Sequence, residues 1–224
     1  LECAQAAHFE INPFDNTAGC FCDEERFTSL MGECAVAAPL ENRTLFSQEF
    51  GAYPQTRYYY LYVPSTYSHD HPAPLLVDLH GTASYTPELA YGLEAAVAAA
   101  EKYGFILLRP RSRSSQEGDY TVYRWDQNYG DTDLNHQFIT DLVEHLSLGY
   151  NLNPDQLYMM GFSSGTNQTA RAATDPDSLF SGYGYVGGGL WLSGSIIRKG
   201  RVYLATGFRD YMRTYHYNLV TRLD

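Results

Sequence analysis

The sequence lacks any apolar run long enough to cross a membrane. A membrane-spanning helix needs about 18 or more apolar residues in succession, whereas the apolar segment at residues 93–100 is shorter and contains Glu94. Basic residues are also few: 15 lysines and arginines are outnumbered by 26 aspartates and glutamates, which gives a net charge of −11. Such a charge repels nucleic acids and anionic lipids, so the sequence predicts no nucleic-acid partner and no membrane partner.

Cysteine is scarce and occurs only in the first 34 residues, at Cys3, Cys20, Cys22 and Cys34. An even number of cysteines in a loop-rich segment is typical of disulfides formed in an oxidising compartment. Cys20 and Cys22 are too close together to pair comfortably, so each is expected to pair with Cys3 or Cys34. A zinc site of four thiolates is the alternative, but the spacing lacks two Cys-x-x-Cys pairs. The cysteines predict two disulfides and a secreted, periplasmic or extracellular location.

The length of 224 residues, with 44% hydrophobic and 18% charged residues, is typical of a globular protein with one sizeable domain. Residues 1–43 carry the cysteines together with prolines and glycines that interrupt regular structure. We interpret this segment as an appended lid or brace, and we expect the catalytic domain at residues 44–224.

Strand-like and helix-like patterns alternate in the catalytic domain. Apolar runs predict strands at residues 57–63, 75–79, 105–108, 157–160, 182–188 and 201–206. Apolar residues at helical spacing predict helices at residues 87–103, 133–148 and 164–173. Because alternating strands and helices form a mostly parallel sheet with helices on both faces, the sequence predicts an α/β fold.

The segment Gly161-Phe162-Ser163-Ser164-Gly165 joins an apolar run to a helical pattern. Gly-x-Ser-x-Gly in that context is the sequence form of a nucleophile elbow, in which a strand turns sharply into a helix and presents one serine. The glycines leave room for a strained backbone. The pattern predicts that Ser163 is a catalytic nucleophile, although a buried structural serine at a similar turn is the alternative.

Two further segments are arranged as a serine hydrolase requires. The strand at residues 75–79 runs into His80-Gly81, where such an enzyme takes one oxyanion-hole N–H from Thr82 or Ala83 and the other from Ser164. His80 is expected to brace this loop. Asp210 follows the strand at residues 201–206 and is the expected acid of a Ser-Asp-His triad, with helix capping as its alternative role.

Together these segments resemble the secreted α/β-hydrolase esterases that include polyhydroxybutyrate depolymerases, feruloyl esterases and acetylxylan esterases. The resemblance covers about residues 57–212. It is carried by the tyrosine-rich strand at 58–64, by residues 75–82 and 152–165, and by Gly207-Phe208-Arg209-Asp210. It implies an α/β-hydrolase fold and acyl transfer from Ser163 to water, and it implies neither a metal nor an organic cofactor.

The sequence departs from this family where the triad histidine should lie. The family's histidine follows a further strand after the acid, but only residues 211–224 follow Asp210. His216 lies among them, at a position expected within a helix and poorly placed to bridge Asp210 and Ser163. We therefore expect a further C-terminal segment with a strand and the histidine, which would complete the sheet.

The connection at residues 109–132 is long for a compact fold and is expected to have no regular structure. It leaves the end of a strand, the edge at which α/β sheets bind ligands. Tyr123 and Trp125 in this connection, and Trp191 after the strand at residues 182–188, are candidate substrate-binding residues, because aromatic rings stack on sugars and phenolic rings. The alternative is that these aromatics pack the connection onto the domain.

The resulting hypothesis is a secreted serine esterase that acts on a polyester such as polyhydroxybutyrate, or on feruloyl or acetyl esters of plant polysaccharide. A secreted peptidase with the same fold and triad is one alternative. A non-catalytic binding module on a degenerate hydrolase scaffold is another. The absence of an evident histidine favours the binding module, and the joint presence of Ser163 and Asp210 argues against it.

Overall fold

A computed structural model describes most of the chain. The described residues are 7–11, 18–22, 26–38, 40, 44–50, 56–85, 87–89, 92–125, 134–188, 200–210 and 213–214. For residues 7–11, 18–22, 26, 28 and 44–50 the backbone alone is described.

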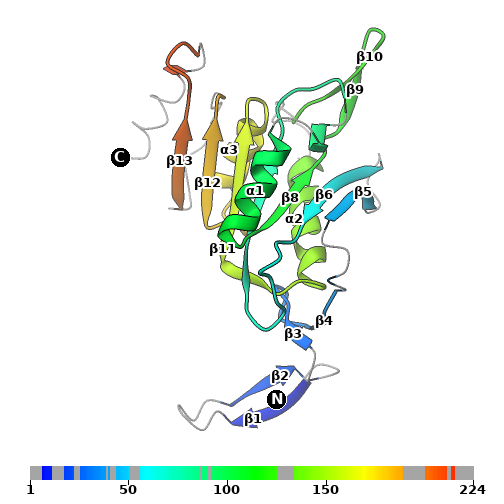
Figure 1. Cartoon of the computed structure of the whole chain (residues 1–224), viewed down its shortest axis with the longest axis vertical. Helices are drawn as coiled ribbons and strands as arrows, with labels where there is room; N and C mark the ends of the chain where they lie inside the picture. Colours follow the sequence, from blue (N-terminus) through cyan, green and yellow to red (C-terminus); the bar gives the residue numbers. More distant parts are fainter. Residues whose placement is uncertain are drawn as a thin grey trace.

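A seven-stranded sheet forms the centre of the molecule (Figure 1). Its strands, from one edge to the other, are β13 (Arg201–Ala205), β12 (Gly182–Val186), β11 (Leu152–Phe162), β7 (Ala73–Leu79), β8 (Ile106–Pro110), β6 (Arg57–Tyr62) and β5 (Thr44–Phe50). The five strands from β13 to β8 are parallel, whereas β6 and β5 pair antiparallel. The prediction of a mostly parallel sheet is confirmed.

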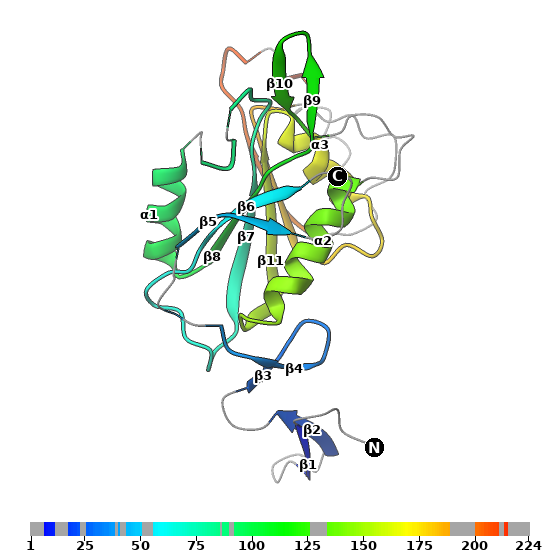
Figure 2. The ribbon, with the colours of Figure 1, turned by 90° about the vertical axis from the view of Figure 1, so that its right-hand side faces the viewer.

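Helices cover both faces of this sheet, with α1 (Leu93–Tyr103) on one face and α2 (Leu134–Ser147) and α3 (Gly165–Ala173) on the other (Figures 1 and 2). The first helix is shorter than predicted. A 3-10 turn, η1 (Pro87–Leu89), precedes it, and Gly92 adopts a left-handed conformation (φ 79°) immediately before α1 begins. In the described part of the chain, no helix is long and apolar enough to cross a membrane.

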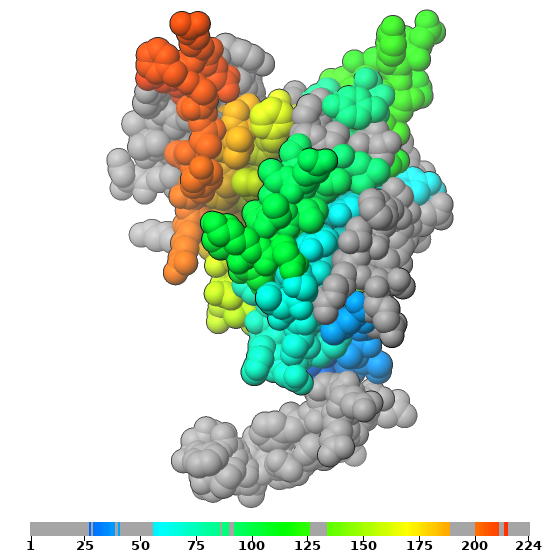
Figure 3. Space-filling model, viewed as in Figure 1, coloured from blue at the N-terminus to red at the C-terminus, as the bar shows by residue number. Residues whose placement is uncertain are grey.

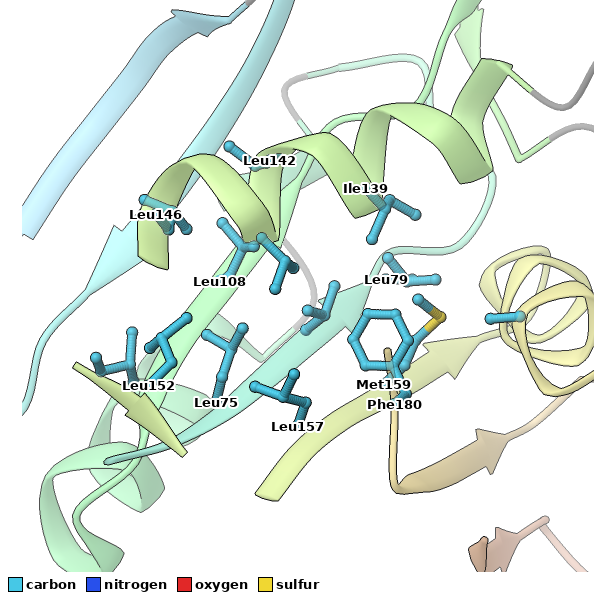
Figure 4. Packing of buried hydrophobic residues seen from close by; sticks show 14 of the residues in the cluster. Leu75, Leu79, Leu108, Ile139, Leu142, Leu146, Leu152, Leu157, Met159 and Phe180 are labelled. Carbon is cyan, nitrogen blue, oxygen red and sulfur yellow. The ribbon is translucent and has the colours of Figure 1, made fainter. Parts of the chain in front are cut away.

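The hydrophobic core lies between the sheet and α2 (Figure 4). Ile139, Leu142 and Leu146 recur at helical spacing on α2 and face the sheet, where they meet strand residues such as Leu75 and Leu108. Each of these side chains is at most 5% exposed. Burial of one such side chain stabilises the fold by roughly 1.5–3 kcal/mol. This layer therefore fixes the sheet against α2.

The opposite face is less completely covered. A cleft of about 260 Å³ lies beside α1 over the strands from β7 to β13, and Figure 3 shows the surface hollowed between α1 and β13. Leu76, Tyr158, Met160 and Tyr203 line it, while Gly182 and Gly184 leave space at its floor. The cleft opens on the face of the sheet, away from the carboxyl ends of the strands.

Two short hairpins precede the sheet: β1 (Ala7–Ile11) with β2 (Ala18–Cys22), and β3 (Arg26–Thr28) with β4 (Cys34–Val36). The segment after β4 meets the domain where the Ala38 N–H donates to the Gly149 carbonyl at 2.8 Å. Phe27 stacks on His69, with ring centroids 5.9 Å apart. Both contacts lie at the amino ends of the parallel strands, so this part of the N-terminal segment braces that edge.

The connection after β8 differs from the prediction, because it contains a hairpin of β9 (Ser114–Glu117) and β10 (Tyr120–Tyr123). Gly118, with φ 62°, begins a two-residue turn. Glycine at the first position suits the turns that join tightly twisted antiparallel strands. The hairpin projects from the end of the molecule at which β11 ends (Figures 1 and 2), so residues 114–123 of this connection have a regular structure that the sequence did not predict.

Candidate active site

The turn between β11 and α3 has the geometry of a nucleophile elbow. Ser163 stands between the last residue of the strand and the start of the helix, and its φ is 50°. Among the described residues it is the one non-glycine with a positive φ. Such a conformation costs about 1–3 kcal/mol and persists where the surrounding structure enforces it. The elbow predicted from Gly-x-Ser-x-Gly is therefore present in the structure.

Close backbone contacts explain the two glycines of this motif. A Cβ on Gly161 would overlap the backbone of Gly165, and a Cβ on Gly165 would lie 2.6 Å from the Leu79 carbonyl oxygen. The elbow is also hydrogen-bonded: the Ser163 N–H donates to the Val186 carbonyl at 3.0 Å. The strained serine is thus held between the ends of β11, β7 and β12.

The loop after β7 runs directly against this serine. A Cβ on Gly81 would lie 3.2 Å from the Ser163 Cβ. The Ala83 N–H donates to the Tyr123 carbonyl at 3.0 Å, and the Tyr123 N–H donates back to the Ala83 carbonyl at 2.7 Å. Because the Ala83 N–H already donates to Tyr123 in β10, Thr82 is the better placed of the two predicted oxyanion donors. In the described part of the chain, no group accepts the N–H of Thr82 or of Ser164.

His80 is locked beneath this loop. Its ring is 2% exposed, its Nε2 accepts the Ser112 N–H at 3.0 Å, and its Nδ1–H donates to the Gly81 carbonyl at 2.5 Å. Burial, the largest cause, lowers the pKa of His80 to about 4 with the help of the positive charges of Arg109, Arg111 and Arg57, although the hydrogen bond to the Gly81 carbonyl acts in the opposite direction. The imidazole is therefore neutral at physiological pH, and its hydrogen bonds agree with the bracing role expected for it.

Asp210 and Ser163 both lie at the carboxyl ends of the parallel strands. Its N–H donates to the Gly207 carbonyl at 3.0 Å, which forms a tight turn after β13. Its Oδ2 lies near Gly187, at the end of β12, because a Cβ on that glycine would be 3.4 Å from this oxygen. Ser163 follows β11, and β11 and β13 are two strand spacings, about 10 Å, apart. A histidine ring can bridge such a gap.

Three described histidines are engaged away from this gap. His80 is held as above, His69 lies at the opposite edge, where its Nε2–H donates to the Ala38 carbonyl at 3.0 Å, and His136 pairs with Asp175 at 2.6 Å. His216 and Trp191 both lie outside the described residues. None of these three described histidines is placed as the base of a triad.

The two remaining aromatic candidates lie at the base of the hairpin, Tyr123 as the last residue of β10 and Trp125 two residues after it. Trp125 is fully buried, and its indole N–H donates to the His80 carbonyl at 2.9 Å. Tyr123 is half-buried, with its ring 5.4 Å from the guanidinium of Arg111. Trp125 thus occupies the position of a packing residue, and contact of either ring with substrate stays a prediction. No sequence pattern indicated the partner of Arg111, whose Nε donates at 2.7 Å to the fully buried Glu88.

Exposed aromatic side chains surround the same end of the molecule. Tyr85 is 50% exposed, Tyr120 at the hairpin tip is 71% exposed, and Phe208, two residues before Asp210, is 82% exposed. In Figure 3 the hairpin and the residues after β13 stand on either side of the end of β11. Such rings can stack on sugar or aromatic groups.

The structure describes the side chain of one of the four cysteines. Cys34, at the start of β4, is disulfide-bonded. The side chains of the other three cysteines lie outside the description, so the two predicted disulfides and their pairing stay predictions. Within the described ranges there is no group of three or more histidine, cysteine, aspartate or glutamate side chains that could hold a metal ion.

The architecture recurs in solved esterases. A thermostable esterase superimposes with a TM-score of 0.62 over 89% of this chain and 58% of its own, at 18% sequence identity. An acetyl xylan esterase from Aspergillus awamori superimposes with a TM-score of 0.51 over 66% of this chain and 52% of its own, at 24% identity. At these identities the likeness concerns the fold, which is that of an α/β-hydrolase.

The sequence comparison defines the family. The profile described as Esterase PHB depolymerase matches residues 57–206, which is more than half of the chain, and the protein belongs to this family. The acetylxylan esterase A of Emericella nidulans is 32% identical over 153 residues, which make up 62% of this chain and 45% of that protein. The chain thus spans about half the length of this curated relative.

Proposed function

We propose that the protein is a serine esterase that hydrolyses carboxylic esters through an acyl-enzyme. The observation that carries this proposal is the strained Ser163 at the elbow, with the N–H groups of Ser164 and Thr82 available beside it. Membership of the esterase family supports the same chemistry. A decayed scaffold would have no reason to retain a strained serine conformation at this position.

In the proposed reaction, Ser163 Oγ attacks the ester carbonyl carbon while a histidine takes its proton. The carbonyl oxygen becomes negative and accepts hydrogen bonds from the N–H groups of Ser164 and Thr82. The carbon–oxygen bond to the alcohol then breaks, and the alcohol leaves with the proton from the histidine. Water attacks the acyl-enzyme by the same route, and the carboxylic acid is released. In this proposal Asp210 orients the histidine.

We propose a polymer-bound ester as the substrate, with an acetyl or feruloyl group on plant polysaccharide first. The relation to an acetylxylan esterase favours this choice, and the exposed rings of Tyr85, Tyr120 and Phe208 are suited to stacking on a polysaccharide. A polyester such as polyhydroxybutyrate is the second candidate, which the family description favours. An extracellular location accords with such substrates and with the disulfide at Cys34.

The catalytic role of Ser163 can be tested directly. Substitution Ser163→Ala should lower ester hydrolysis at least ~1,000-fold, because the remaining oxyanion hole supports little catalysis without its nucleophile. A fluorophosphonate probe should label Ser163 in the full-length protein, as mapped by mass spectrometry. The matched control is Ser178→Ala, which alters a buried serine in the core. Labelling at another serine, or full activity in Ser163→Ala, would exclude the mechanism.

A second measurement separates the substrate candidates. Acetate released from acetylated xylan, ferulate released from feruloylated arabinoxylan and hydroxybutyrate released from a polyhydroxybutyrate film are compared at equal enzyme concentration. We expect the polysaccharide esters to be hydrolysed faster. Release of peptides from casein with no release from any ester would instead support the peptidase alternative.

A further inference from the structure

The loop that carries Thr82 is clamped from below by one segment of the chain. Residues 80–83 connect β7 to the N-terminal side of η1, and residues 112–125 follow β8. Four hydrogen bonds join these two segments, and they involve both the first and the last residue of the loop. Thr82, the residue whose N–H faces the developing oxyanion in the proposed reaction, lies between the clamped ends.

The first residue of the loop is held by both its ring and its backbone. His80 Nε2 accepts the Ser112 N–H at 3.0 Å, and the His80 carbonyl accepts the indole N–H of Trp125 at 2.9 Å. The two rings also pack on one another, with centroids 5.1 Å apart. Both side chains are at most 2% exposed, so neither hydrogen bond is open to competition from bulk water.

The last residue of the loop is held by the hairpin. The paired hydrogen bonds between Ala83 and Tyr123, at 3.0 and 2.7 Å, form an isolated antiparallel bridge at the base of β10. Arg111 lies under Tyr123 and is paired with the buried Glu88, which fixes the start of the segment. Residues 112–125 are therefore fixed at their start by the Arg111–Glu88 pair, and they contact the loop at both His80 and Ala83.

We propose that Trp125 and His80 are positioning residues of the oxyanion hole, which hold the Thr82 N–H at the distance that the transition state requires. This inference rests on the esterase function proposed above. Oxyanion donors act within a narrow range of about 2.7–3.1 Å, and loss of one donor lowers kcat by about 100- to 1,000-fold. A loop attached at two ends keeps its donor in place before substrate binds, whereas a free surface loop would not.

The decisive variant is Trp125→Phe, which keeps an aromatic ring but removes the indole N–H. We expect kcat for a p-nitrophenyl ester to fall about 10-fold or more while KM changes less than about threefold, because the hydrogen bond matters to the transition state and not to substrate binding. Fluorophosphonate labelling of Ser163 should slow in parallel, since the phosphoryl oxygen occupies the same hole.

The matched control is Tyr183→Phe. The Tyr183 hydroxyl is buried and hydrogen-bonds to Ser178 at 2.9 Å in the core, so its removal costs stability without touching the loop. If Trp125→Phe lowers the melting temperature as Tyr183→Phe does but leaves kcat and the labelling rate at wild-type values, the inference is wrong. A loss of kcat in Trp125→Phe alone supports it.

Two His80 variants provide a test that does not depend on whether Trp125→Phe folds correctly. His80→Gln retains a side chain that can accept a hydrogen bond, whereas His80→Ala does not. We expect His80→Gln to recover at least part of the kcat that His80→Ala loses, and equal kcat values for the two would contradict the inference. Failure of the proposed function is recognised separately, because then Ser163→Ala and the wild-type protein would hydrolyse esters equally.

Discussion

At the scale of single residues, His80 couples the site to pH. Burial holds the pKa of its imidazole at about 4 in the folded protein, against an ordinary value of 6.5. Between these values the unfolded chain binds a proton that the folded protein excludes, so stability is complete above pH 6.5 and falls as the pH approaches 4. The difference between the pKa of 6.5 in the unfolded chain and about 4 in the folded protein corresponds to roughly 3 kcal/mol.

We therefore expect the free energy of unfolding of the wild-type protein to fall by about 3 kcal/mol more than that of His80→Gln between pH 6.5 and 4. Urea titrations at several pH values measure this difference. The comparison with the variant is needed because burial raises the pKa of Asp78, which acts on stability with the opposite sign. Identical pH dependence in the two proteins would contradict the assignment.

At the scale of elements, the elbow depends on how closely β11, β7 and α3 approach one another. A methyl group on Gly165 would lie 2.6 Å from the Leu79 carbonyl oxygen, so the helix must shift before it can be accommodated. We expect Gly165→Ala to cost about 1–3 kcal/mol of stability and to lower kcat at least 10-fold, because Ser163 moves with the helix. Thermal unfolding and p-nitrophenyl ester kinetics measure the two effects.

Gly32→Ala is a suitable control for that experiment. Gly32 has a φ of 78° and open space around it, so a methyl group costs about 1 kcal/mol through backbone strain alone. This glycine lies in the turn between β3 and β4, which form a separate hairpin near the amino ends of the parallel strands, whereas Ser163 lies at their carboxyl ends. The variant should be destabilised with kcat unchanged. A similar loss of kcat in both variants would mean that activity follows general stability.

At the scale of the whole molecule, the described part of the N-terminal segment contacts the amino ends of the parallel strands, whereas the candidate site lies at their carboxyl ends. Reduction should therefore lower the melting temperature and leave kcat unchanged below the new transition, because the disulfide at Cys34 acts on the brace. Intact-mass measurement with and without reductant should differ by four hydrogens if all four cysteines are paired. Four thiols that alkylate in the native protein would contradict the prediction.

Much of the site was predictable because it depends on short segments. The elbow follows from Gly161, Ser163 and Gly165, whose spacing reports a local backbone conformation. Asp210 follows from its place after a strand, since parallel strands deliver their carboxyl ends to one edge. The hairpin at residues 114–123 was missed because β9 consists of Ser-Ser-Gln-Glu, which carries no apolar periodicity, and β10 alone has only four residues.

The sequence by itself determined the α/β architecture, the serine at the elbow and the position of Asp210 directly after a strand. These depend on apolar periodicity, on glycine at close approaches and on chain order, all of which are local properties. The tertiary structure decided which of Thr82 and Ala83 has an available N–H, and that Trp125 lies under the loop with its N–H on the His80 carbonyl. Those choices come from contacts between residues about 40 positions apart, which depend on the path of the chain between them and which no local pattern records.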